Sequence, residues 1–130
     1  MFFNYYNEKV YYEEFGEGKP ILIIHGLACN IELMKGCIEP IFKKVNGYKR
    51  IYIDLLGMGK SNKCSLEYAS SDKILEMLLS FIKEKMDKMS DDEKLSLLSE
   101  NGMLVKRPIV LGDKFALVGF KESEWQNVWQ

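Results

Sequence analysis

The sequence has few of the residues that bind metals or form disulfides. Among its 130 residues it contains one histidine, His25, and three cysteines, Cys29, Cys37 and Cys64. Because the cysteines are few and widely spaced, they do not suggest a disulfide framework or a zinc site. We therefore expect a reduced, cytoplasmic protein with no metal and no other cofactor.

Long apolar runs and an excess of one charge are also missing. The apolar stretch PILIIHGL is long enough for a core strand, but a membrane span needs about 20 residues. The net charge is −1, so no general attraction to nucleic acid or to anionic membranes is expected. The first ten residues, MFFNYYNEKV, lack the basic and long apolar segments of a secretory signal.

The first part of the chain predicts a hairpin, a buried strand and a helix. Aromatic and β-branched residues in Phe2–Tyr6 and Val10–Glu14 flank a turn at Asn7-Glu8-Lys9. The continuous apolar run ILIIHG indicates a strand that is buried on both faces. Asn30 can cap the next helix, whose apolar positions are Ile31, Met34, Ile38, Ile41, Phe42 and Val45.

A second strand and helix follow. Pro40 lies inside the first helical pattern and predicts a kink or a restart there. The run YKRIYIDLLG indicates another buried strand, and Gly57, Gly59 and Ser61 mark the loop after it. The next helix is predicted over Ser71–Lys85, with apolar positions Ile74, Leu75, Leu78, Leu79 and Ile82. This element order favours two parallel strands with a right-handed crossover.

The stretch KEKMDKMSDDEK, residues 83–94, is dense in charge and lacks apolar periodicity. It marks a boundary between two parts of the chain or the solvated end of a helix, and the pattern fits both. Beyond it we expect two strands, at about 104–111 and 115–119, joined by Gly112-Asp113-Lys114. A final helix carries Trp125, Val128 and Trp129 on one face.

Two motifs in residues 1–85 resemble the N-terminal part of the α/β-hydrolase fold. They are YYEEFGEGKPILIIHG, which ends in His25-Gly26, and IYIDLLGMGKS, similar to the family's Asp-x-x-Gly-x-Gly-x-Ser segment. The resemblance implies that His25 and Gly26 are a remnant of the loop that helps to form the oxyanion hole through backbone N–H groups. Because the chain has no Gly-x-Ser-x-Gly motif and no other histidine, we expect it to lack hydrolase activity.

Residues 87–130 resemble the C-terminal third of the arsenate reductase family, including its Spx-type regulatory members. The matching stretch, MSDDEKLSLLSENGMLVKRPIVLGDKFALVGFKESEW, is nearly continuous. The resemblance implies a thioredoxin-like fold in which Arg107 helps to bind an oxyanion and Pro108 is a cis-proline facing a reactive cysteine. The residues alone also fit a surface charge and a proline that ends an edge strand. The family's N-terminal cysteine motif is missing.

The predicted fold class is α/β, in one domain of residues 1–130. It combines a hydrolase-like segment, 1–85, with an arsenate reductase-like segment, 86–130. We expect a single mixed sheet with helices on both faces and a thioredoxin-like arrangement of the strand–helix core. Its order is the N-terminal hairpin, two parallel strands at 51–55 and 21–25, and an antiparallel C-terminal hairpin at 104–111 and 115–119.

In this arrangement Cys29 lies on the loop after the central strand, near a helix N-terminus, where thioredoxin-like enzymes carry their reactive cysteine. A helix N-terminus and a nearby arginine, Arg107, both favour a thiolate. However, the motif HGLACNIE has no second cysteine or serine three residues on. A buried, unreactive cysteine is therefore the default expectation.

We expect a folded hybrid of two incomplete enzyme halves without a competent catalytic site. One alternative is an arsenate reductase-like or Spx-like thiol protein that uses Cys29 and Arg107. A second is a truncated α/β-hydrolase-family protein. A third is a non-enzymatic interaction module, since Spx-type proteins are partners of the transcription machinery. The sequence identifies no partner for this chain, and it fits a natural join as well as an engineered one.

Overall fold

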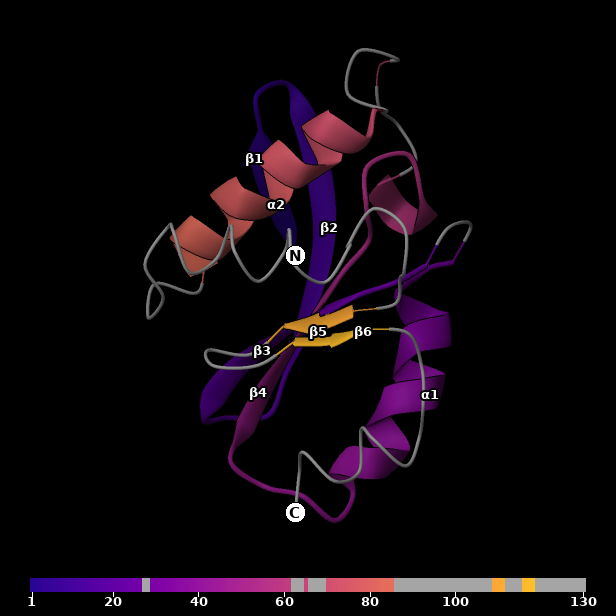
Figure 1. Ribbon diagram of the computed structural model, residues 1–130, viewed down its shortest axis with the longest axis vertical. Helices are drawn as coiled ribbons and strands as arrows, with labels where there is room; N and C mark the ends of the chain where they lie inside the picture. Colours follow the sequence, from indigo (N-terminus) through magenta and orange to yellow (C-terminus); the bar gives the residue numbers. More distant parts are fainter. Residues whose placement is uncertain (27–28, 62–64, 66–69, 86–108, 112–115, 119–130) are drawn as a thin grey trace.

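The computed structural model describes residues 1–26, 29–61, 65, 70–85, 109–111 and 116–118 (Figure 1). They form one six-stranded mixed sheet in the order β1-β2-β4-β3-β5-β6, together with two α-helices. The prediction of a mixed α/β fold is therefore confirmed. The elements are β1 (Phe2–Tyr5), β2 (Glu8–Phe15), β3 (Lys19–Ile24), α1 (Ile31–Phe42), β4 (Tyr48–Ile53), the 3-10 turn η1 (Gly59–Ser61), α2 (Ser71–Lys85), β5 (Ile109–Leu111) and β6 (Ala116–Val118).

The N-terminal hairpin has a shorter turn than predicted. Tyr5 pairs with Glu8, so Tyr6 and Asn7 form the turn and Glu8 and Lys9 belong to β2. Tyr6 takes a left-handed backbone conformation, with φ of 53°. Two-residue turns with a positive φ match the twist of the flanking strands. The chain therefore turns at Tyr6-Asn7, and the predicted turn at Asn7-Glu8-Lys9 is wrong.

Strand β3 lies between one parallel and one antiparallel neighbour. It pairs parallel with β4, with Ile24 opposite Ile53. On its other side it pairs antiparallel with β5, with Ile24 opposite Ile109. The carboxyl ends of β3 and β4 and the amino end of β5 therefore meet at one edge of the sheet.

Successive residues of β3 contribute to two different apolar clusters. Leu22 and Ile24 pack with residues of α2, whereas Ile21 and Ile23 pack with residues of α1. All four side chains are at most 1% exposed. Because each buried side chain of this size contributes about 1.5–3 kcal/mol, residues 21–24 of this strand have to be apolar on both faces of the sheet.

Helix α2 has the predicted bounds but a somewhat different buried face. Ile74, Leu78 and Ile82 are buried as predicted, whereas Leu75 and Leu79 are only partly buried. Met77 and Phe81 are fully buried, which the sequence pattern missed. The Phe81 ring makes edge-on contacts with the rings of Phe3 and Tyr12 in the N-terminal hairpin. This aromatic packing accompanies the difference between the predicted and the observed buried face of α2.

Helix α1 begins as predicted and continues past its proline. The Leu33 N–H donates to the side chain of Asn30 over 3.0 Å, which confirms the predicted N-cap. No restart occurs at Pro40, since the helix runs on to Phe42. Because the helix ends only two residues later, just the end of its last turn lies beyond the backbone hydrogen bond that the proline removes.

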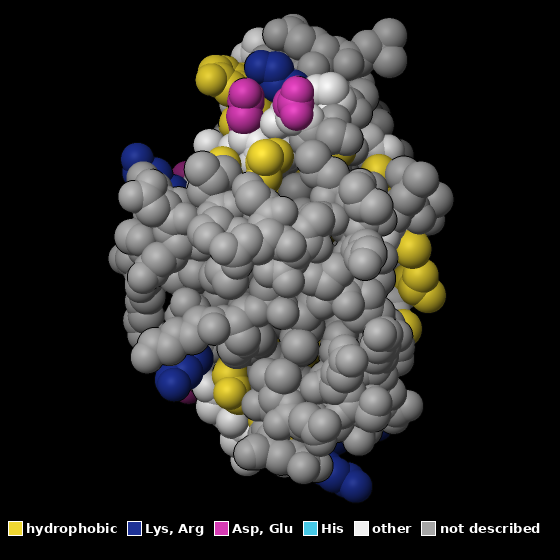
Figure 2. All heavy atoms as spheres, viewed as in Figure 1, with side chains coloured by type: hydrophobic (Ala, Val, Ile, Leu, Met, Phe, Trp, Pro, Cys, Tyr) yellow, Lys and Arg dark blue, Asp and Glu magenta, His cyan; other side chains and the backbone are white. Residues whose placement is uncertain are grey.

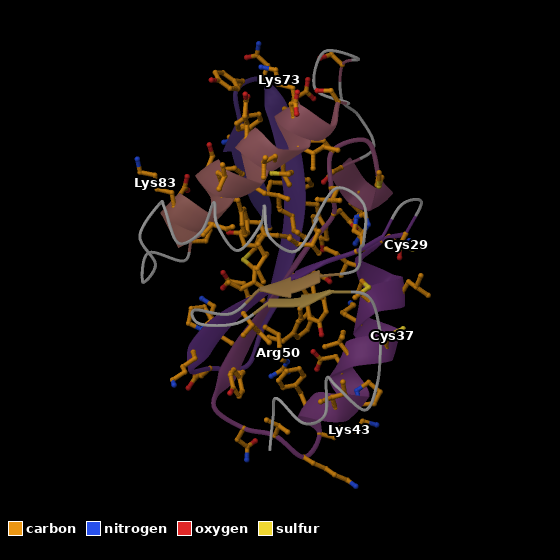
Figure 3. All side chains as sticks on the ribbon, in the orientation of Figure 1. Cys29, Cys37, Lys43, Arg50, Lys73 and Lys83 are labelled. Carbon is orange, nitrogen blue, oxygen red and sulfur yellow. The ribbon has the colours of Figure 1, made fainter. Side chains whose placement is uncertain are left out.

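A charged cluster joins α1 to β4. Both carboxylate oxygens of Glu39 accept hydrogen bonds of 2.9 Å from the Arg50 guanidinium, and the Tyr52 hydroxyl donates to Oε1 of Glu39 over 2.5 Å. The guanidinium also lies 5.0 Å from the centre of the Phe42 ring. A bidentate arginine–carboxylate pair fixes orientation as well as distance, so this cluster sets the position of α1 on the sheet (Figure 3).

The C-terminal part is described only in its two short strands. β5 and β6 pair antiparallel with each other and lie within the strands predicted at 104–111 and 115–119. The charge-dense stretch beyond residue 85 and the final helix with Trp125, Val128 and Trp129 lie outside the described residues.

The Glu39 cluster predicts a loss of stability in acid. Burial raises the pKa of Glu39, but the hydrogen bonds from Arg50 and Tyr52 outweigh it and hold the pKa below its ordinary value of 4.5. A carboxylate whose pKa is lower in the folded state stabilises the fold above the unfolded pKa, and this contribution disappears as the pH falls through the folded pKa. Urea unfolding should therefore show a steeper loss of stability below pH 4.5 in the wild type than in Glu39→Gln. Equal slopes in the two proteins would contradict this role of Glu39.

Candidate functional site

The candidate site lies where β3 and β4 end. His25 follows β3, Asp54 follows β4, and α1 begins at Ile31 on the same edge of the sheet. In open α/β sheets, ligands usually bind outside the carboxyl ends of the parallel strands. The Asp-x-x-Gly-x-Gly-x-Ser motif, residues 54–61, occupies this edge.

Every polar atom of Asp54 is hydrogen-bonded to the protein. Oδ1 accepts from the Ile31 N–H over 2.8 Å, and Oδ2 accepts from the Lys60 N–H over 2.9 Å. Its backbone N–H donates to the Tyr11 carbonyl over 2.9 Å, and its carbonyl accepts from the Ser61 hydroxyl over 2.7 Å. The residue is 2% exposed, so its carboxylate serves as an internal cap for α1 and for the loop after β4.

The motif's serine and second glycine also have structural roles. The Ser61 hydroxyl donates to Asp54 and accepts from the Tyr11 N–H over 2.8 Å, so it joins the loop to β2. Gly59 has φ of 53°, and a Cβ atom there would lie 2.4–2.5 Å from the Asp54 carboxylate group. Gly57 also has a left-handed φ, of 84°. The loop therefore closes around Asp54 only because no side chain stands at position 59.

His25 is completely buried and bonded to backbone atoms. Its Nε2 accepts from the Leu55 N–H over 3.0 Å, which assigns the ring proton to Nδ1. Nδ1 then donates to the Gly26 carbonyl over 2.7 Å. Nε2 also lies 4.0 Å from Oδ1 of Asp54. Because the ring is neutral in this tautomer, this contact is not a salt bridge.

The serine, histidine and aspartate at this edge are thus all engaged by backbone groups. The sequence comparison of motifs singled out His25, Gly26 and the Asp-x-x-Gly-x-Gly-x-Ser segment, but it assigned no role to Asp54. The signal in the sequence is an acidic residue directly after a predicted buried strand. The carboxyl ends of such strands lie where the helices of the fold begin, so a carboxylate there can accept hydrogen bonds from a helix N-terminus.

Cys29 lies where the sequence predicted, on the loop between β3 and α1. It precedes the cap residue Asn30, is partly exposed, and donates its backbone N–H to the Gly26 carbonyl over 3.2 Å. Cys37 lies further along α1 and is exposed (Figure 3). Both are free thiols.

The other predicted partners of Cys29 lie outside the described residues. These are Arg107, the expected oxyanion ligand, and Pro108, the expected cis-proline. Cys64 also lies outside them. Gly26, the second residue of the predicted oxyanion remnant, is partly exposed next to the buried His25.

A cavity of about 270 Å³ opens at the start of α1. It is slightly smaller than typical ligand pockets, which hold about 300–1,000 Å³. The charged side chains of Glu32 and Lys60 stand on its lining, and the Asp54 carboxylate there is already hydrogen-bonded. The full lining is Tyr11, Asn30, Ile31, Glu32, Asp54, Gly59 and Lys60.

The described surface carries both charge signs. Where described side chains are visible in Figure 2, lysine or arginine and acidic side chains are interspersed with apolar ones. Among the described residues no group of three or more His, Cys, Asp or Glu side chains is placed to hold a metal ion. In that same part of the chain no helix is both long and apolar enough to cross a membrane.

Comparison with known proteins supports both resemblances. Residues 76–128 match the ArsC family. The chain is 46% identical over 48 residues to the uncharacterized protein YusI of Bacillus subtilis, which covers 37% of this chain and 41% of that protein. It is 32% identical over 90 residues to 2-hydroxy-6-oxo-6-(2'-aminophenyl)hexa-2,4-dienoic acid hydrolase of Metapseudomonas resinovorans, which covers 69% of this chain and 29% of that enzyme. The predicted hybrid of hydrolase-like and arsenate reductase-like parts is consistent with these matches.

The extents of the matches locate the region that they share. Any stretch of 90 residues in a chain of 130 includes residues 41–90, so the hydrolase match covers β4 and α2. The ArsC match begins at residue 76, inside α2. The second half of α2 therefore lies in both matches. The chain spans less than half the length of each of these curated relatives, and no solved structure matches it.

The packing around Asp54 predicts opposite effects of one substitution at two glycines. Gly59→Ala should lower the free energy of unfolding by about 2–4 kcal/mol, because it adds backbone strain and a clash with the carboxylate. Gly36→Ala, inside α1 and with no side chain or other chain segment within 4 Å of the added Cβ, should raise it by about 0.5–1 kcal/mol. Urea unfolding followed by circular dichroism measures both, and a similar change in both variants would contradict the close approach at Gly59.

Proposed function

We propose that the chain is a folded hybrid whose hydrolase-like half provides a scaffold and no hydrolytic site. The observation that carries this proposal is the engagement of His25, Asp54 and Ser61 by backbone groups in the described core. A catalytic triad needs a serine bonded to a histidine and the histidine bonded to a carboxylate. Here the Ser61 hydroxyl donates to a backbone carbonyl, and Nε2 of His25 accepts from a backbone N–H.

We further propose that the two parts share a thioredoxin-like core with a helix on each face of the sheet. The division of β3 between the α1 and α2 clusters supports this arrangement. The presence of the end of α2 in both matches supports a join within this helix. A strand followed by an amphipathic helix is common to both families, so such a join preserves the apolar face that each part has to bury.

The scaffold proposal predicts no esterase activity. The purified protein should release no p-nitrophenol from short p-nitrophenyl esters, and no thiol from thioesters, above the rate in buffer. An oxyanion loop without a nucleophile and a base gives little acceleration. Turnover that scales with protein concentration and persists through repeated purification would overturn the proposal.

A second candidate function, thiol chemistry at Cys29, is favoured by one observation. β5 pairs antiparallel with β3, with Ile24 opposite Ile109. Ile109 begins β5 at the sheet end where the loop with Cys29 starts, and Arg107 precedes Ile109 by two positions in the sequence. An arginine and a reactive cysteine at this position would handle an oxyanion, as the resemblance to the arsenate reductase family implies.

The local charges weigh against strong activation of this thiol. Two of the first three N–H groups of α1 are already occupied, since Ile31 donates to Asp54 and Leu33 donates to Asn30. The carboxylate of Asp54 therefore already offsets the positive end of the helix that would favour a thiolate. For this reason we rank thiol chemistry below the scaffold proposal.

Thiol labelling separates the two candidates. The scaffold proposal predicts that Cys29 reacts with iodoacetamide no faster than the exposed Cys37. Thiol chemistry predicts that Cys29 reacts fastest at about pH 6, and that Arg107→Ala removes this advantage. The measurement is peptide mapping of labelled protein across roughly pH 5–9.

The matched control for Arg107→Ala is Lys106→Ala. It removes the charge of the adjacent residue and leaves the arginine in place. If both substitutions slow Cys29 equally, general electrostatics explains the rate and the thiol candidate is abandoned. A selective effect of Arg107→Ala would instead overturn the claim that the chain has no chemical site.

A further inference from the structure

The N-terminal strand has a hydrogen-bonded neighbour on one side only in the described sheet. β1 stands at the end of the strand order and pairs with β2. Natural edge strands usually carry charged residues, prolines or bulges that prevent pairing with other chains. Residues 1–7, MFFNYYN, contain no charged side chain and no proline.

The direction of the β1 backbone groups follows from its pairing. The Tyr12 N–H donates to the Met1 carbonyl over 3.0 Å, and Tyr5 pairs with Glu8 beside the turn. In antiparallel pairs, hydrogen-bonded and non-hydrogen-bonded positions alternate. Phe3 therefore directs its N–H and C=O toward β2, whereas Asn4 directs both toward the edge.

Large apolar side chains gather at the same edge. Three of the five exposed large hydrophobic residues in the described part of the chain belong to this segment: Met1, at 53%, Phe2, at 56%, and Tyr6, at 74%. Phe2, Asn4 and Tyr6 are all exposed, while Phe3 and Tyr5 between them are buried. The edge thus carries no charged side chain of β1, exposes aromatic ones and provides outward-facing hydrogen-bonding groups.

We propose that β1 is a docking edge for the β1 strand of a second copy of this chain. Asn4 pairs antiparallel with Asn4 of the other copy about a twofold axis, which joins the outward N–H and C=O groups of both. The same register sets Phe2 of each copy beside Tyr6 of the other, on one face. Uncharged side chains of β1 therefore face uncharged side chains in every pair. A partner strand with charged side chains would set charge beside the exposed Phe2 and Tyr6.

The expected association is weak and reversible. Pairing of two such short strands buries less surface than the roughly 1,200–2,000 Å² of a stable interface. Sedimentation velocity should therefore show a shift from monomer toward dimer as the protein concentration rises. A wild-type protein that stays monomeric up to its solubility limit would overturn the proposal. Growth into larger open-ended assemblies would also overturn it, because a twofold contact closes at the dimer.

Two substitutions at one position provide the matched test. Asn4→Pro removes the outward N–H and should leave the protein monomeric at every concentration, without removing a hydrogen bond to β2. Asn4→Thr keeps the N–H and suits a strand, so this variant should dimerise like the wild type. Equal association of the two variants would contradict the proposed pairing.

A cross-linking experiment covers the case in which Asn4→Pro fails to fold. Hydrogen-bonded antiparallel positions have Cα atoms ~5.5 Å apart, within the range for a disulfide. In a background with Cys29, Cys37 and Cys64 changed to serine, Asn4→Cys should form covalent dimers on mild oxidation. Asn46→Cys, at an exposed loop position before β4, should not. Equal cross-linking of both variants, or none in Asn4→Cys, would overturn the proposal.

Discussion

The carboxylate of Asp54 is the contact on which this end of the molecule depends. It accepts hydrogen bonds from the first residue of α1 and from the loop after β4, and its backbone bonds to β2 and to Ser61. A single buried residue thus holds together three segments that are far apart in the sequence. A buried carboxylate is tolerated in the core only when such donors replace the water it has lost. The left-handed glycine at position 59 is required because a side chain there would occupy the same space.

This arrangement explains why the hydrolase-like sequence signature is useful to the fold itself. The residues of the Asp-x-x-Gly-x-Gly-x-Ser segment make contacts that the fold itself needs, and His25 bonds to Leu55 within the same loop. The presence of such a motif therefore indicates how the loop packs before it indicates any chemistry. Chemistry would additionally need side-chain atoms aimed at a substrate, and in the described part of this edge the polar atoms of His25, Asp54 and Ser61 are aimed at the backbone.

The hydrolase-like and arsenate reductase-like parts of the chain contact each other at β3. β3 buries alternate side chains against α1 and α2, and on its other side it accepts β5 from the arsenate reductase-like part. The Glu39–Arg50–Tyr52 cluster fixes α1 on β4, independently of that part. A sheet edge that offers backbone hydrogen bonds and apolar side chains makes few demands on the sequence of the strand it receives.

The sequence alone determined features whose causes are local. The Asn30 cap, the bounds of α2 and the two-sided burial of β3 follow from residues within a few positions of each other. The tertiary structure decided the rest. The burial of Phe81 depends on the aromatic rings of the N-terminal hairpin, the passage of α1 through Pro40 depends on where that helix ends, and the role of Asp54 depends on α1 starting beside it. Periodicity and capping act over one or two turns of chain, whereas these contacts exist only once strand order has brought distant residues together.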